Sequence, residues 1–173
     1  MVSKKDFTKY LNNLSKDELI KELEKLYGKF KNVKDFYSME LAEDTTGILN
    51  KYKEALKKEY FPNTKFGIGA ARASVARKII SDFTKIKVYD IDLIELMLFR
   101  VELCVEFTKQ FGDINEQFYT STENAFETVV KLIVKNKLEE GFKERCKNLI
   151  HETEDFGWGF YDTLSGIYNQ YFN

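Results

Sequence analysis

Glutamate residues recur along one strongly apolar stretch of the chain, at spacings that bring them onto the same side of a helix. Glu95, Glu102 and Glu106 interrupt residues 91–107, where most other side chains are apolar. At about 100° per residue, spacings of 7 and 4 place the three carboxylates within roughly 40° of one another. Carboxylates on a buried helix need cations or hydrogen-bond donors as partners.

Antiparallel packing of the neighbouring helices would supply those partners. A helix folded back before residues 88–89 sets Arg72 level with Glu106, and a helix folded back after Gly112 sets Glu123 level with Glu102. The spacing therefore predicts a buried polar cluster of Arg72, Glu102, Glu106 and Glu123.

Three interpretations of this cluster remain open. It could be an ion-pair network that fixes helix register, a solvated helix face, or a carboxylate-based metal or acid/base site at Glu102, Glu106 and Glu123. A ferritin-type di-iron site is disfavoured because it requires two Glu-x-x-His motifs, and the chain has a single histidine, His151. We assign no catalytic residue, metal ligand or cofactor.

A basic segment offers a different chemistry. Lys65, Arg72, Arg77 and Lys78 surround a predicted helix start, and the chain has no acidic residue from 60 to 81. Free amides at a helix N-terminus together with basic side chains can bind an anion such as phosphate. The Gly-Ile-Gly-Ala-Ala-Arg sequence at 67–72 matches neither a Walker loop nor a dinucleotide-binding fingerprint.

Near the C-terminus, two glycines flank the only tryptophan, Trp158, and predict a tight turn. Trp158, Tyr161 and Asp162 are candidates for a partner-binding surface. The aromatic side chains of this stretch could instead anchor the last helix to the core. His151 and the nearby acids match no metal-ligand spacing.

The elements that must position these residues are all predicted to be helices. Gly and Pro are rare, apolar residues recur at helical spacing, and Ser15 begins a capping box with Glu18. The predicted fold is all-α: one domain over residues 1–173, built as a bundle or an irregular α-solenoid of eight or nine antiparallel helices. These helices are expected at about 7–14, 15–30, 33–41, 46–60, 70–86, 90–111, 114–137, 138–152 and 160–171.

Composition narrows the class of protein. A net charge of −1 argues against a general nucleic-acid binder, and no stretch approaches the length of a membrane span. Two lone cysteines and no apparent signal segment favour the cytoplasm. The charge is uneven, because residues 60–88 carry six basic and one acidic side chain, whereas residues 89–173 carry eight and sixteen.

Three stretches, residues 14–20, 105–113 and 155–162, together resemble a family of small bacterial proteins known only as a domain of unknown function. The resemblance implies a bacterial, cytoplasmic, single-domain helical protein and no particular activity. It also implies that Glu106, Gly112, Asp113, Trp158 and Asp162 are features of the family.

These patterns lead to one expected function and two alternatives. With no catalytic signature and many aromatic residues, the chain is expected to be a non-enzymatic protein-interaction module. The alternatives are a nucleic-acid or phosphate-ligand binder using the basic 65–78 segment, and the carboxylate site at Glu102, Glu106 and Glu123.

Overall fold

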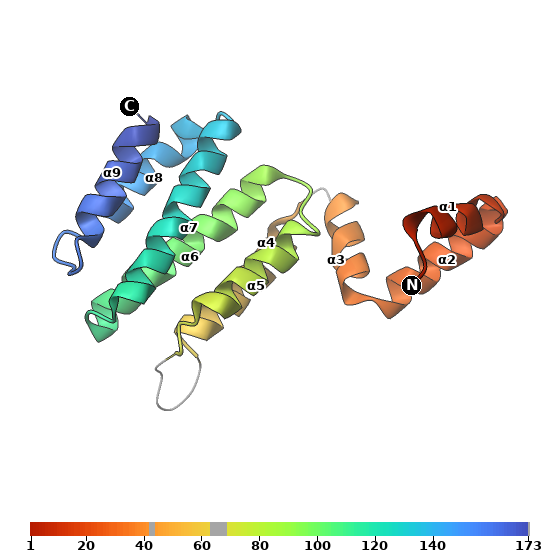
Figure 1. Cartoon of the computed structure of the whole chain (residues 1–173), viewed down its shortest axis with the longest axis horizontal. Coiled ribbons are helices and arrows are strands. Elements are labelled where there is room, and N and C mark those ends of the chain that lie inside the picture. The colour runs from red at the N-terminus through yellow and green to blue at the C-terminus, as the bar shows by residue number, and fades with distance from the viewer. Residues whose placement is uncertain (42–43, 63–68, 173) are drawn as a thin grey trace.

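The computed structural model describes residues 1–41, 44–62 and 69–172 (Figure 1). Within these ranges the chain forms α-helices and no strands, which confirms the all-α prediction. The helices are α1 (Lys4–Asn12), α2 (Lys16–Lys29), α3 (Lys31–Glu40), α4 (Thr46–Tyr60), α5 (Ala73–Thr84), α6 (Asp90–Phe111), α7 (Glu116–Lys135), α8 (Glu139–His151) and α9 (Phe160–Phe172).

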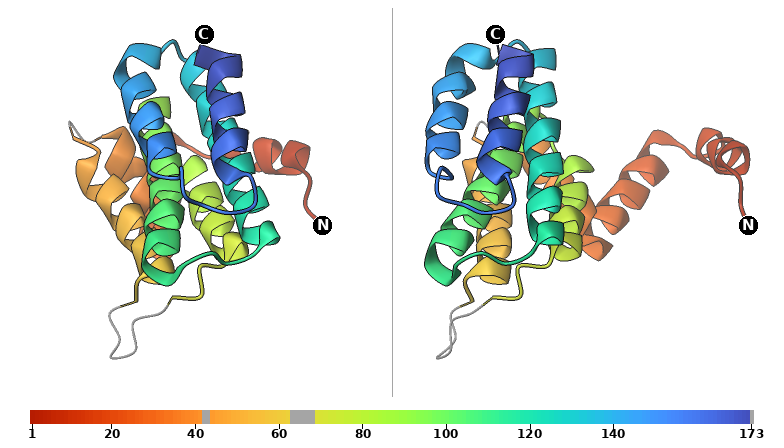
Figure 2. Two further views of the ribbon diagram at one scale, coloured as in Figure 1. Left: turned by 90° about the vertical axis from the view of Figure 1, so that its left-hand side faces the viewer. Right: turned by 60° about the vertical axis from the view of Figure 1, so that its left-hand side comes forward.

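Six of these helices form three pairs that stack side by side: α4 with α5, α6 with α7, and α8 with α9 (Figure 1). Viewed along the stack, α4, α6 and α8 form one layer and α5, α7 and α9 the other (Figure 2). Helices α4 and α6 pack closely in the first layer, as do α7 and α9 in the second. The arrangement resembles the solenoid alternative more than a single closed bundle.

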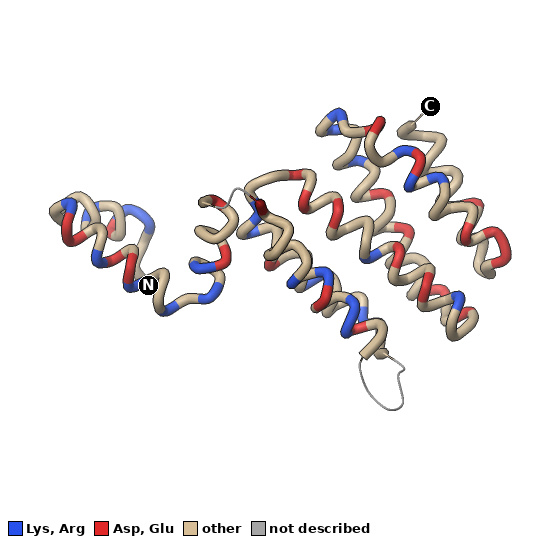
Figure 3. The backbone as a smooth tube through the Cα atoms, turned by 180° about the vertical axis from the view of Figure 1, so that it is seen from behind, with Lys and Arg blue, Asp and Glu red and all other residues tan. Residues whose placement is uncertain are grey.

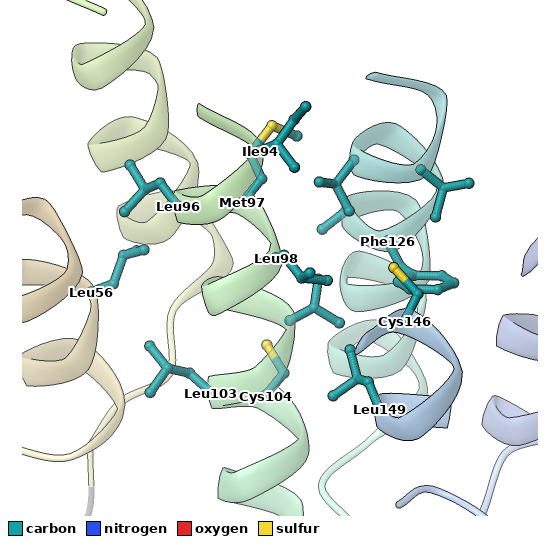
Figure 4. Packing of buried hydrophobic residues seen from close by; sticks show 14 of the residues in the cluster. Leu56, Ile94, Leu96, Met97, Leu98, Leu103, Cys104, Phe126, Cys146 and Leu149 are labelled. Carbon is teal, nitrogen blue, oxygen red and sulfur yellow. The ribbon is translucent and has the colours of Figure 1, made fainter. Parts of the chain in front are cut away.

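Helix α6 is the centre of the core. It contacts α4, α5 and α7, and apolar side chains cover most of its circumference. Leu96, Leu98 and Val101 have no exposed surface, and Leu56 of α4 and Phe126 of α7 are equally buried (Figure 4). An apolar surface on nearly every side of a helix requires burial on nearly every side, which explains why α6 lies in the middle.

The backbone before α5 is fastened to the end of α4. The amide of Gly69 donates to the carbonyl of Tyr60 at 3.1 Å, and the amide of Ala71 donates to the carbonyl of Glu59 at 3.2 Å. Arg72 then serves as the N-cap of α5 with extended backbone angles. The hydrogen bonds from Gly69 to Tyr60 and from Ala71 to Glu59, together with the Arg72–Glu59 ion pair, therefore fix where α5 begins.

Gly69→Ala is expected to lower the free energy of unfolding by about 2–3 kcal/mol. A Cβ at position 69 would lie 2.1 Å from the carbonyl oxygen of Tyr60, so the backbone itself must move. Urea denaturation measures the change. The control is Gly141→Ala in α8, where nothing lies within 4 Å of the added atom, and where we expect a gain of roughly 0.5–1 kcal/mol. Equal effects at the two positions would contradict the prediction.

The first two helices extend away from the three stacked pairs as an arm, with α3 between them and α4 (Figures 1 and 2). No residue of α1 or α2 is buried. Both begin with capping boxes, Ser3 with Asp6 and Ser15 with Glu18, so the box predicted at Ser15 is confirmed.

Candidate functional site

A groove lies between α5 and α7, and Met97 and Arg100 of α6 contribute to its lining. Figure 1 shows where these three helices lie in the fold. The groove consists of two adjoining hollows of about 540 and 620 Å³, which share Arg77 and Ser121. The first hollow lies over the middle of α6, and the second lies toward the start of α5. Each has the size of a typical small-molecule site.

Arg100 of α6 lies in the first hollow and is 95 % buried, with 5 % of its surface exposed. Its Nη2 atom donates to the hydroxyl of Ser121 at 3.1 Å, whereas its Nε atom has no partner among the described residues. No carboxylate in the described ranges forms an ion pair with it. A buried cation without a counter-charge is unfavourable, so this position is suited to an anion supplied from outside the chain.

The polar groups behind Arg100 are neutral. The Cys104 thiol donates to the Tyr60 hydroxyl at 3.3 Å. Burial and the neighbouring Cys104 raise the pKa of Tyr60 despite the opposing charge of Arg100, and burial raises the pKa of Cys104. Neither group therefore ionises near neutral pH to balance the guanidinium charge.

The walls of the groove add a second cation and a row of uncharged polar groups. Arg77 of α5 is exposed, lines both hollows and forms no ion pair with a described residue. Helix α7 contributes one amide or hydroxyl side chain per turn, at spacings of 4, 3 and 4: Gln117, Ser121, Asn124 and Thr128. The apolar lining of the first hollow comes from Ile80, Met97 and Ala125.

These groups can recognise an anion and orient what is attached to it. Guanidinium groups bind carboxylate and phosphate through paired, charge-assisted hydrogen bonds. Hydroxyl and amide groups can donate to the remaining oxygens, and the apolar lining favours a ligand with an apolar body. Across the described ranges, no three His, Cys, Asp or Glu side chains gather in a way that could hold a metal ion.

The basic residues predicted from the sequence have separate locations. Lys65 lies outside the described residues. Arg72 and Arg77 line the second hollow, but Arg72 is paired with Glu59 at 2.8 Å. Lys78 forms an ion pair with Asp82 at 2.9 Å and does not line the groove.

The predicted cluster of Arg72, Glu102, Glu106 and Glu123 is wrong. The prediction started the fifth helix at residue 70, which put Arg72 on its inner face, whereas α5 starts at Ala73. The Arg72 side chain is 62 % exposed and bonds Glu59 through Nε and Nη2, at 2.8 and 3.0 Å. Glu106 is exposed. Glu123 is half-buried, and burial raises its pKa against the opposing effect of a hydrogen bond with Thr163.

Glu102 does belong to a half-buried ion-pair network, with Arg145 of α8 as its partner. Arg145 Nε and Nη2 donate to the two Glu102 oxygens at 2.6 and 3.0 Å, and Nη1 donates to Glu95 at 2.8 Å. Lys53 of α4 completes the network with a 3.1 Å bond to Glu95. The network thereby joins α4, α6 and α8, the three helices of one layer.

The three C-terminal candidates do not share one environment. Trp158 is 58 % exposed and has a positive φ of 63°, Asp162 is exposed, and Tyr161 packs against the core. The turn is attached to the rest of the protein through Asp113, which accepts from the Gly157 amide at 3.3 Å and from the Tyr119 hydroxyl. Burial and the bond to Asp113 raise the pKa of Tyr119 to about 12.

The sequence prediction did not include Arg100, the buried cation of the groove, or Arg145, the centre of the ion-pair network. Arg100 is the one cation inside the apolar run 96–105, and that isolation is the signal that identifies it. Arg145 lies between Phe142 and Leu149 at helical spacing, on the same side of its helix. A charged residue on an apolar stripe requires a partner, whichever its sign.

Together these features define an all-helical protein of stacked helix pairs with a basic groove. The chain belongs to a family described as a family of unknown function (DUF6155), whose model matches residues 2–172. This membership confirms the resemblance to an uncharacterised family. No curated protein and no solved structure matches the chain. None of the described helices has the length and apolar character needed to cross a membrane.

Proposed function

We propose that this protein binds a small organic anion in the groove between α5 and α7. The phosphate or carboxylate group of the ligand lies against Arg100 and Arg77, and its apolar body lies over Ile80 and Met97. The observation that carries this proposal is the burial of Arg100 without a carboxylate partner, in the wall of a hollow of about 540 Å³.

This proposal keeps the anion-binding alternative and changes its location. The helix start at 65–78 contributes Arg77, whereas Lys78 and Arg72 have acidic partners of their own. The enzyme alternative at Glu102, Glu106 and Glu123 loses support because Arg145 bonds both oxygens of Glu102 and Glu123 is hydrogen-bonded with Thr163 of α9. Glu106 lines the same hollow as Glu102 and Arg145, but it is exposed. A cytoplasmic location is part of the proposal and is supported by two buried cysteines that form no disulfide.

Phenyl phosphate and benzoate test the proposal because each joins an anion to an apolar ring. Calorimetric titration is expected to show binding of at least one of them, with inorganic phosphate weaker and uncharged phenol weakest. Arg77→Gln should weaken binding about tenfold, since a charge-assisted hydrogen bond contributes roughly 1.5 kcal/mol.

Lys78→Gln is the matched control for this experiment. It removes one positive charge from the next position of α5, but Lys78 is paired with Asp82 and lies outside the groove. We expect less than a twofold change in affinity. Equal weakening by the two substitutions would show that net charge rather than the groove determines binding, and failure of both anions to bind would reject the proposal.

A further inference from the structure

The N-terminal arm carries an apolar surface that the rest of the described chain does not cover. Six large side chains of the arm are each 42–51 % exposed: Phe7, Tyr10, Ile20, Leu23, Tyr27 and Phe30. Ile20, Leu23 and Tyr27 follow one another at spacings of 3 and 4, so they form a single stripe on α2. The rings of Phe7 and Tyr10 stack at 6.3 Å on α1.

The arm is held away from the remainder of the fold by α3. Asp35 of α3 is buried and forms an ion pair with Lys51 of α4 at 2.7 Å, and Lys31 lies 3.7 Å from the same carboxylate. This anchoring fixes the direction in which α2 leaves the stacked pairs (Figure 2). Within the described ranges the three stripe residues remain 42–50 % exposed, with Lys34 of α3 lying 6.0 Å from the centre of the Tyr27 ring.

We infer that the arm is a self-association surface, and that the stripe on α2 packs against the same stripe of a second copy with the two helices antiparallel. An isologous pairing of this kind requires a surface that is complementary to itself. A single apolar stripe along one helix is complementary to itself in this sense, because it can pack against an identical stripe.

The charges along α2 favour the antiparallel orientation. Residues 16–24 of α2 carry four acidic and two basic side chains, whereas residues 25–29 carry two basic side chains, Lys25 and Lys29, and no acidic one. An antiparallel pair places each acidic half beside the basic half of the second copy, and a parallel pair would place like charges together. Figure 3 shows charges of both signs on the arm. Acidic residues near the start of α2 and basic residues near its end also stabilise the helix itself, because they complement the helix dipole.

The exposed area is sufficient for a weak dimer. Six large side chains at nearly half exposure present roughly 500 Å² per copy. The α2 stripes supply about half of this surface, so two copies reach about 1,000 Å², the lower limit of specific interfaces, when the α1 side chains flank the paired stripes and are buried with them.

Sedimentation equilibrium of the full chain tests the inference. We expect a concentration-dependent particle of twice the 20.4 kDa chain mass. Leu23→Glu should weaken the dimer about tenfold or more, because it places a charge in the centre of the stripe. Lys21→Gln, which lies away from the stripe on α2 and changes the charge by one unit, is the control and should leave the dimer within about twofold. A monomer at every concentration, or equal weakening by both variants, would overturn the inference.

Cysteine cross-linking tests the orientation independently. In an antiparallel pair that superposes the two stripes, position 20 of one copy faces position 27 of the other. A mixture of Ile20→Cys and Tyr27→Cys chains should form a mixed disulfide dimer under mild oxidation, and neither variant alone should do so efficiently. Cys104 and Cys146 are buried and should not interfere. Cross-linking of each variant with itself would contradict the antiparallel arrangement.

Discussion

Replacing Arg100 with Met is expected to raise the free energy of unfolding of the ligand-free protein by about 1–3 kcal/mol. The side chain is buried among groups that supply no negative charge, and its Nε atom has no hydrogen-bond partner. Met has a similar length, suits the neighbouring Met97 and Ala125, and requires no counter-charge. The losses of the 3.1 Å bond to Ser121 and of the hydrogen bond with Tyr60 cost about 1 kcal/mol each, which is less than the cost of burying the ion.

The same substitution should abolish binding of phenyl phosphate or benzoate. Opposite signs for stability and binding distinguish a ligand site from a structural arginine, because sites prepared for a ligand are often unfavourable without it. Urea denaturation and calorimetry measure the two effects on one preparation. Arg100→Lys is the control: it retains the charge, so it should bind measurably and should not be stabilised. If Arg100→Met instead loses several kcal/mol, Arg100 is a structural residue and the proposed function fails.

The sequence predicted the helices well because their signals are local. The capping box at Ser15 and the glycine at position 112 mark helix ends through interactions within a few residues. The apolar circumference of the 90–111 helix also predicted its central position, since such a surface is stable only when surrounded. How the pairs stack was left open, because it depends on contacts between residues far apart in the chain.

The predicted polar cluster was wrong because the prediction placed Arg72 inside the fifth helix. Starting the fifth helix three residues early turned Arg72 from an exposed partner of Glu59 into an inward-facing residue. Arg72 precedes the first helical residue, and its extended backbone directs the side chain toward Glu59 of α4 instead of along the inner face of α5. The partner assigned to Glu102 was therefore on the wrong helix, although the need for a partner was predicted correctly. Arg145 supplies it from α8.

The network around Arg145 has a pH dependence that follows from its charges. Burial would raise the pKa of Glu95, but the hydrogen bonds and charges of Arg145 and Lys53 outweigh burial and lower it. A carboxyl group whose pKa is lower in the folded state contributes stability above its unfolded pKa of about 4.3. It loses that contribution as the pH falls through the folded pKa. The network should therefore stabilise the protein at neutral pH and much less in acid.

Arg145→Met is expected to cost about 2–3 kcal/mol near neutral pH, less than the 3–5 kcal/mol for fully buried pairs because these side chains are about 30 % exposed. Without the arginine, Glu102 loses its cation and Glu95 keeps only Lys53, and a protonated carboxyl group needs no cation. The cost should consequently shrink below about pH 4. Urea denaturation across this range measures it. Lys109→Met, which breaks the exposed pair with Glu152, is the control and should cost under about 1 kcal/mol. A cost for Arg145→Met that does not change with pH would mean that Arg145 acts by packing its aliphatic stem between α6 and α8 rather than by neutralising Glu95 and Glu102.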